Sequence, residues 1–319
     1  MGKPNTAIRR YLSDKERYAD LFNAACCSGE QVFRAEDLEN ADGEQDAVLE
    51  TAEGSRVIVQ RFRDLKMTAP QDTKLIILAE ETQHDIHYAM PVRSMLYDAL
   101  DYAEQVKQIG EKNKKEKNYK NSAEFLSGLT KEDRLAPALT LCLYIGDGKW
   151  DGCTDLHSLL GIDDKMPDAF KKYIPNYHTN LVDAKELANS NLLKTDLQYL
   201  FGMLEYRQDK EKLTSYMHQH RDYFENVDLD SYYAAEALLG NDRKLKEFRQ
   251  KEGTVNMCKA LEDLYQDGRA EGRAEGRTDK IKEQIQKKLA KGHSAELIAD
   301  ALEEDIEVIK KLIEEVSNQ

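Results

Sequence analysis

The chain has 319 residues, of which 40% are hydrophobic and 33% charged, and its formal net charge is −14. No apolar run approaches the ~20 residues that a membrane-spanning helix needs, so we expect a soluble, cytoplasmic protein with no membrane partner. Five scattered cysteines, none in a CxxC pair, are typical of reduced thiols and argue against a cysteine-ligated zinc site. The acidic balance argues against a protein that holds nucleic acid mainly through phosphate contacts.

The N-terminal part of the chain predicts a helix, a loop and two strands. Residues 7–27 carry apolar side chains at roughly helical spacing. Residues 28–55 contain nine carboxylates and few periodic apolar residues, and we expect a long loop with a short helix there. Residues 57–67 are rich in alternating β-branched side chains, and residues 73–83 are more apolar. The short link between these two strands, which contains Pro70, predicts a hairpin.

The middle of the chain predicts a helix, a basic segment and a buried strand. Pro91 suits the first turn of a helix, and the apolar face of that helix extends to Val106. Residues 107–120 hold six lysines against two glutamates; we expect an exposed, mobile segment, and the alternative is a basic patch that binds phosphates. Residues 135–146 are almost continuously apolar, as in a strand covered on both faces. Residues 177–187 form a weaker strand candidate.

Residues 191–248 carry a helical pattern throughout. The last third of the chain then contains glycines that recur every four residues. Gly268, Gly272 and Gly276 together cost a helix about 3 kcal/mol relative to alanine. The repeat therefore predicts either a strained helix held by a partner or a flexible hinge. Ser294 is a good N-cap for the first of two further helices with helix-turn-helix spacing.

Residues 294–319 are too acidic for a DNA-reading element, because they hold eight carboxylates against two lysines. Readers of base edges use arginine, asparagine or glutamine. We expect self-association instead, through an apolar stripe that consists of Ile298, Leu302, Ile306, Ile309, Leu312, Ile313 and Val316.

The most informative motif is the polar end of the strand predicted over 73–83, which reads Glu80-Glu81-Thr82-Gln83. Because strand side chains alternate between faces, Glu81 and Gln83 share one face, and Glu80 and Thr82 point the other way. A hairpin would bring Asp64 beside Glu81. Two carboxylates there repel each other unless a cation or a proton intervenes, and Mg²⁺ prefers such oxygen ligands. A solvated sheet edge is the simpler interpretation of the motif alone.

The pattern D-x16-E-x-Q, followed by HYAMPVR and a long helix, resembles the PD-(D/E)XK nuclease superfamily. Within it, the chain is similar to the bacterial recombination-promoting nuclease and transposase family. ADLFNAACCSGEQVF resembles that family's opening, LAPALTLCLYIGDGKWDG its central strand and turn, and MCKALEDLYQDGRAEGRAEG its glycine-punctuated tail. The similarity spans most of residues 7–277. It implies an α/β fold with a restriction-endonuclease-like mixed sheet flanked by helices.

The resemblance also implies a Mg²⁺-dependent DNA endonuclease, in which Mn²⁺ can substitute, that promotes recombination or DNA mobility. Asp64 and Glu81 match the metal-binding acids, and Gln83 stands where the superfamily has a lysine. Either Glu16 or Asp20 would add an acid from the first helix. We expect a nuclease-like core over residues 1–190, a helical extension over 191–255, and a tail over 256–319 for self-association.

The glutamine in place of the lysine opens a second interpretation. Gln83 can orient a water molecule but carries no charge, and Lys66, on the same strand face as Asp64, is a candidate for the missing charge. The alternative is a catalytically silent nuclease-fold protein that acts as an oligomerising or regulatory module. His84 and His87 are expected to have packing or hydrogen-bonding roles.

Overall fold

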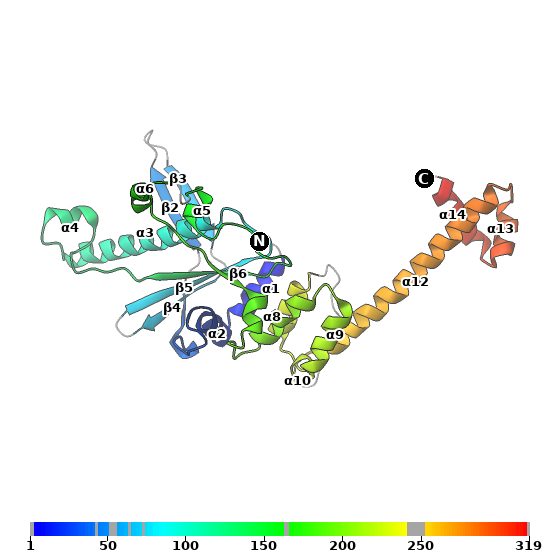
Figure 1. The fold of residues 1–319 in the computed structure, drawn as a ribbon, viewed down its shortest axis with the longest axis horizontal. Coiled ribbons are helices and arrows are strands. Elements are labelled where there is room, and N and C mark those ends of the chain that lie inside the picture. Colours follow the sequence, from blue (N-terminus) through cyan, green and yellow to red (C-terminus); the bar gives the residue numbers. More distant parts are fainter. Residues whose placement is uncertain are drawn as a thin grey trace.

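The computed structural model describes residues 3–41, 44–50, 56–62, 65–71, 74–162, 166–240 and 253–317. It is an α/β structure with a five-stranded mixed sheet, a separate two-stranded hairpin and many helices (Figure 1).

The chain begins with two helices where the sequence predicted one. α1 spans Lys3–Leu12 and α2 spans Lys15–Cys26. The break occurs because Asp14 caps α2, and its carboxylate accepts from the backbone N–H groups of Glu16 and Arg17 at 3.0 and 3.1 Å. A side-chain acceptor at this position satisfies N–H groups that have no partner within the helix.

The expectation of a loop over 28–55 is only partly confirmed. A short 3₁₀ helix, η1 (Ala35–Asp37), and β1 (Glu39–Asn40) follow α2. β2 (Glu44–Glu50) then pairs with β3 (Arg56–Phe62) in an antiparallel hairpin. The sequence pattern did not predict β2, because its carboxylates interrupt the apolar residues. A two-stranded ribbon does not need continuous apolar residues.

The strand predicted over 57–67 is divided between two sheets. Its first part is β3, and its last residues belong to β4 (Leu65–Gln71). β4 pairs antiparallel with β5 (Lys74–Gln83), and Leu65 lies opposite Glu80. The predicted hairpin leading into β5 is therefore confirmed, but β4 carries the pairing through Pro70, which the sequence had assigned to the turn.

The main sheet has the strand order β1-β4-β5-β6-β7, and its last three strands are parallel. β6 (Ala138–Tyr144) pairs with β5 so that Cys142 lies opposite Glu81. Residues 141–144 of β6 are buried, as the apolar sequence predicted. β7 (Asn180–Asp183) is shorter than the predicted strand over 177–187, because α7 (Ala184–Asn189) begins at once.

Helices cover both faces of this sheet (Figure 1). α3 (Met90–Glu116) crosses from β5 to β6 on one face, and it begins at Met90 and Pro91 as predicted. The basic segment that was expected to be mobile instead continues α3 to Glu116 and leads into α4 (Ser122–Ser127). α2 lies on the other face, where the Tyr18 hydroxyl donates to the Leu78 carbonyl at 3.0 Å.

The α2 face of the sheet joins the helical extension in one continuous apolar core. The remaining helices are α5 (Leu156–Leu159), α6 (Asp168–Tyr173), α8 (Leu197–Tyr206), α9 (Lys210–Gln219), α10 (Arg221–Phe224) and α11 (Leu229–Leu238). Buried side chains of α1, α2, β4–β6 and α7–α11 pack together in this core. Residues on both sides of the predicted boundary at 190 thus share one apolar interior.

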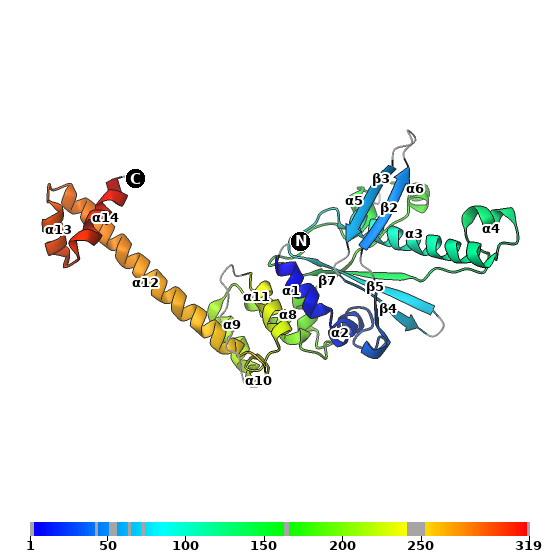
Figure 2. The same ribbon diagram turned by 180° about the vertical axis from the view of Figure 1, so that it is seen from behind.

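The tail is a long helix with two short helices packed on its end (Figures 1 and 2). α12 (Met257–Leu289) runs without a break through the glycine repeat. α13 (Ala295–Leu302), capped by Ser294 as predicted, and α14 (Ile306–Ser317) follow. Ile298 and Ile309 pack against Ile285 of α12. The apolar stripe that was expected to seek another chain is therefore covered largely within this one.

Within the described ranges, no helix combines the length and the apolar character that crossing a lipid bilayer requires.

Candidate active site

Charged side chains gather between α3 and the sheet, on the face opposite α2. Residues 93, 97 and 101 of α3 lie one turn apart and so share one side of the helix. Arg93 Nη2 donates to Glu81 Oε2 at 3.0 Å, which joins the start of α3 to the end of β5. Glu81 is fully buried, whereas a third of the Arg93 side chain is exposed (33%). A buried carboxylate is costly without a cation, and Arg93 supplies one.

Further along α3, two more carboxylates face the sheet. Asp98 accepts a hydrogen bond from Thr140 of β6 at 2.5 Å and another from Tyr177. Asp101 lies 2.8 Å from the ammonium of Lys66 on β4, and both side chains are largely buried. These contacts fix the rotation of α3 about its axis, and therefore the position of Arg93 over Glu81.

The alternation predicted for the strand end is confirmed. Glu80 points to the opposite face from Glu81, is fully buried, and accepts a hydrogen bond from the Thr82 hydroxyl at 2.8 Å. Cys142, opposite Glu81 in the register, has its pKa raised to about 12 by burial and by the nearby charges of Glu80 and Glu81. This thiol therefore stays protonated and is no candidate nucleophile at neutral pH.

The residues predicted to act with Glu81 have different placements. Asp64 lies outside the described residues. Gln83 is half-buried at the end of β5. Lys66, the candidate for the missing charge, is held by Asp101, so its charge is balanced within the protein.

The structure does not bring Glu16 and Asp20 to Glu81, because α2 and α3 lie on opposite faces of the sheet (Figure 1). Asp20 is buried and accepts hydrogen bonds from the Lys194 and Thr195 N–H groups and from the Thr195 hydroxyl, at 2.7–3.1 Å. Glu16 is exposed. In the described part of the chain, no three His, Cys, Asp or Glu side chains are grouped closely enough to hold a metal ion.

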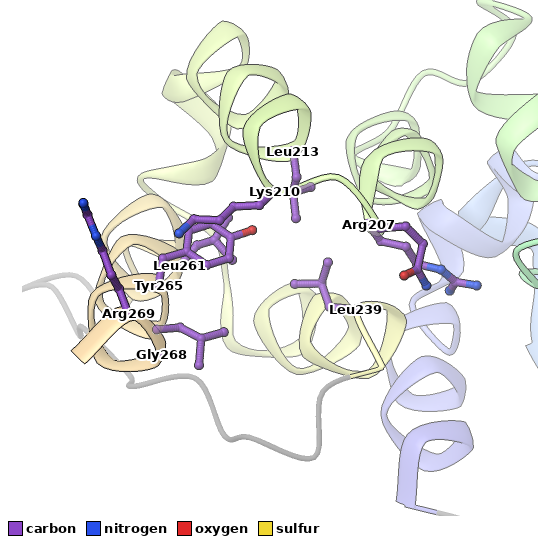
Figure 3. Close-up of a pocket in the computed structure, with 10 residues that line it drawn as sticks. Arg207, Lys210, Leu213, Leu239, Leu261, Tyr265, Gly268 and Arg269 are labelled. Carbon is purple, nitrogen blue, oxygen red and sulfur yellow. The ribbon is translucent and has the colours of Figure 1, made fainter. Parts of the chain in front are cut away.

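A cavity of about 440 Å³ lies elsewhere, between α9, α11 and α12 (Figure 3). Leucines form much of its wall, and Lys210 sits 4.0 Å from the centre of the Tyr265 ring. Arg207 also lines it, but its guanidinium pairs with Asp147 at 2.5 Å. None of the predicted site residues lines this cavity.

Arg93 is the residue of this site that the sequence reasoning did not identify. The sequence carries a signal for it, because Arg93 lies two residues after Pro91 in the first turn of a helix that directly follows the acidic strand end. A right-handed crossover returns such a helix across the end of the strand that precedes it. What could not be read from the sequence is which turn of the helix faces Glu81.

Comparison with protein-family models, with curated proteins and with solved structures found no match to this chain.

Proposed function

We propose that this chain is a divalent-metal-dependent endonuclease that hydrolyses DNA phosphodiester bonds and promotes recombination or DNA mobility. The observation that carries the proposal is the position of Glu81. It is a fully buried carboxylate at the end of β5, beside the β4–β5 hairpin and under the start of α3, where Arg93 reaches it at 3.0 Å. The order helix, antiparallel hairpin, crossover helix and parallel strand supports a restriction-endonuclease-like fold.

In this proposal the carboxylates of Glu81 and Asp64 hold Mg²⁺, or Mn²⁺ in its place. Asp64 is assigned this role because it precedes Leu65, which pairs with Glu80. Carboxylate oxygens are the donors that such hard cations prefer. The bound ion would supply an activated water and stabilise charge on the phosphate.

The remaining roles belong to Gln83 and Arg93. Gln83, on the same face as Glu81, orients the attacking water or the phosphate. Arg93 orients Glu81, and its partly exposed guanidinium offers the positive charge that Gln83 lacks. A guanidinium suits this role because its planar donors match phosphate oxygens.

A catalytically silent nuclease-fold protein is the second candidate, and the same ion pair favours it. Arg93 neutralises Glu81 without any metal ion. In such a protein the ion pair would hold β5 and α3 together, and the chain would act as an oligomerising or regulatory module.

Nicking of supercoiled DNA with Mg²⁺ or Mn²⁺ tests the proposal. We expect nicking by the wild type, its loss in Asp64→Ala and Glu81→Gln, and its retention in Glu16→Ala, because Glu16 is exposed on the other side of the sheet. Activity that survives both Asp64→Ala and Glu81→Gln would refute the assignment.

Titration calorimetry with Mn²⁺ separates the two candidates. For a nuclease, Mn²⁺ binding depends on Asp64 and Glu81, and Arg93→Gln slows nicking about 10²-fold while the ion still binds. For a silent protein, the wild type binds no Mn²⁺, and Arg93→Gln does not create nicking activity.

A further inference from the structure

α3 continues beyond the sheet and forms, with α4 and the segment that returns to β6, an arm over residues 107–137. The arm projects away from the body of the molecule in both views (Figures 1 and 2). Its returning segment is fastened to α3 at the base, where Gln105 exchanges two hydrogen bonds with the backbone of Ala136 at 2.6 and 3.1 Å. The arm is therefore anchored to the helix that carries Arg93.

The end of the arm has a defined shape although it lies far from the main core. Gly128 ends α4 with a positive φ of 77°, a conformation that favours glycine, and it lies against Gly110 of α3. The Tyr119 hydroxyl donates to the Gly110 carbonyl at 2.8 Å, and the buried Asn113 amide donates to Asp133 at 2.7 Å. These contacts hold the tip in one conformation.

This ordered tip presents two large apolar side chains to solvent. Phe125 is 70% exposed and Leu126 is 89% exposed. The Phe125 ring packs edge-on against Tyr119, with 5.8 Å between ring centres, so its direction is set. Adjacent apolar side chains that an ordered helix such as α4 holds in water are typical of a contact surface.

The charge of the arm indicates the kind of partner. Residues 107–134 hold eight lysines and arginines against five carboxylates, a net charge of +3 in a chain of net charge −14. Two of these carboxylates are engaged inside the arm, where Glu124 accepts from the Lys120 N–H and Asp133 from Asn113. Across the described ranges no ion pair involves Lys112, Lys114, Lys115 or Lys117, all of which are exposed.

The length of α3 relates the arm to the candidate active site. Lys117 caps the helix 24 residues after Arg93, and at about 1.5 Å per residue this separation is about 36 Å. One turn of B-form DNA measures about 34–36 Å. A duplex lying along α3 with a phosphate at Glu81 would reach the arm one turn away.

We propose that the arm is a nucleic-acid contact surface. Lys114, Lys115 and Lys117 bind backbone phosphates about one helical turn from Glu81, and Phe125 and Leu126 pack against bases at the same place. That the bound nucleic acid is DNA rests on the proposed function. Binding of DNA to the arm requires neither a metal ion nor cleavage of the DNA.

Fluorescence anisotropy in EDTA, with a 30-base-pair and a 10-base-pair duplex, tests this proposal. The triple variant Lys114→Gln/Lys115→Gln/Lys117→Gln should bind the longer duplex at least tenfold more weakly. It should also lower the slope of log K against log salt by about 2.7, and weaken binding of the short duplex less, because a duplex of about one turn can bind the body of the chain without reaching the arm. Leu126→Ser should weaken binding of the longer duplex about fivefold, because it removes apolar surface that the contact would bury.

The matched control is Lys280→Gln/Lys287→Gln/Lys291→Gln, which changes the net charge equally on the exposed side of the tail. The proposal is overturned if both triple variants lose DNA affinity equally, or if the arm variant loses none. Binding to vesicles with 30% phosphatidylserine that Leu126→Ser abolishes, with DNA binding unaffected, makes the arm a membrane contact and also overturns it. Arm-dependent DNA binding without any nicking upholds this inference and counts against the nuclease.

Discussion

Two buried carboxylates, Glu81 and Asp20, are stabilised by different means, and the difference indicates their roles. Glu81 is paired with a side chain of opposite charge, Arg93, a third of which is exposed. Asp20 is held by backbone N–H groups and a hydroxyl of residues 194–195. Such a carboxylate is a structural anchor between α2 and the segment that leads into α8, whereas Glu81 joins the end of β5 to the start of α3 through one ion pair.

Asp20→Ala is expected to lower the free energy of unfolding by about 2–3 kcal/mol, because it leaves buried N–H groups without an acceptor. Urea unfolding followed by circular dichroism measures this change, and Asp20→Asn, which keeps one acceptor oxygen, should have a smaller effect. Unchanged stability together with lost Mn²⁺ binding would instead make Asp20 a metal ligand.

Asp147 predicts a pH dependence of stability. Its hydrogen bond from Arg207 holds the pKa of the Asp147 carboxyl below its usual value. A lowered pKa gives stability that is present above the unfolded-state pKa, near 3.9, and is lost as the pH falls through the folded-state value. We expect Asp147→Asn to be less stable than the wild type at pH 7 by about 0.2–1 kcal/mol, since the carboxylate is half-exposed.

The difference between wild type and Asp147→Asn should be smaller at pH 3 than at pH 7, as measured by urea unfolding at both pH values. Asp151→Asn, at an exposed aspartate of the same turn, is the control. A difference that grows as the pH falls would contradict the assigned direction of the pKa shift.

At the scale of elements, two long helices each connect distant features. α3 carries Arg93 and the charged contacts to the sheet at one end and the arm at the other. α12 connects the main core to α13 and α14. Its glycine repeat is helical throughout, so of the two sequence predictions the structure shows a helix and not a break.

The helical glycines predict a gain in stability on substitution. A Cβ added at Gly272 or Gly276 meets nothing within 4 Å, so the double variant Gly272→Ala/Gly276→Ala should stabilise α12 by about 1–2 kcal/mol. Hydrogen exchange of the α12 amides should slow accordingly. Faster exchange, or a change in sedimentation, would show instead that the glycines serve a close contact with a partner.

At the scale of the whole molecule, the described residues form two apolar clusters of very different size. The larger includes the α2 face of the sheet and the helices around it. The smaller contains Ile285, Ile298, Ala299, Ile309 and Leu312 at the far end of α12. Because few residues are buried there, the tail should open at lower free energy than the main core.

Ile298→Asp should unfold the tail cluster alone, because it places a charge at a fully buried position. Hydrogen exchange should become fast in α13 and α14 and stay slow in α2 and β5. Leu297→Asp, at the exposed neighbouring position, should change neither. Loss of protection in β5 would show that the two clusters unfold together.

Local sequence was sufficient where one interaction decides the structure. The alternation of Glu80 and Glu81 follows from the geometry of a strand, and the helix starts at Pro91 and Ser294 follow from the chemistry of the first turn. The burial of β6 follows from its continuous apolar run, although the strand (Ala138–Tyr144) is shorter than the run over residues 135–146. The mixed α/β class could be predicted because its helices and strands follow from such local patterns.

Tertiary structure decided the features that depend on contacts between distant residues. Local pattern placed 57–67 in one strand, but pairing divides it between two sheets. The C-terminal stripe needed a partner, and only the fold shows that α12 provides it. Likewise, only the fold shows that Asp20 accepts hydrogen bonds from residues 194–195 and that Arg93 pairs with Glu81. A single residue's chemistry does not specify its partner, because the partner is set by how helices cross the sheet.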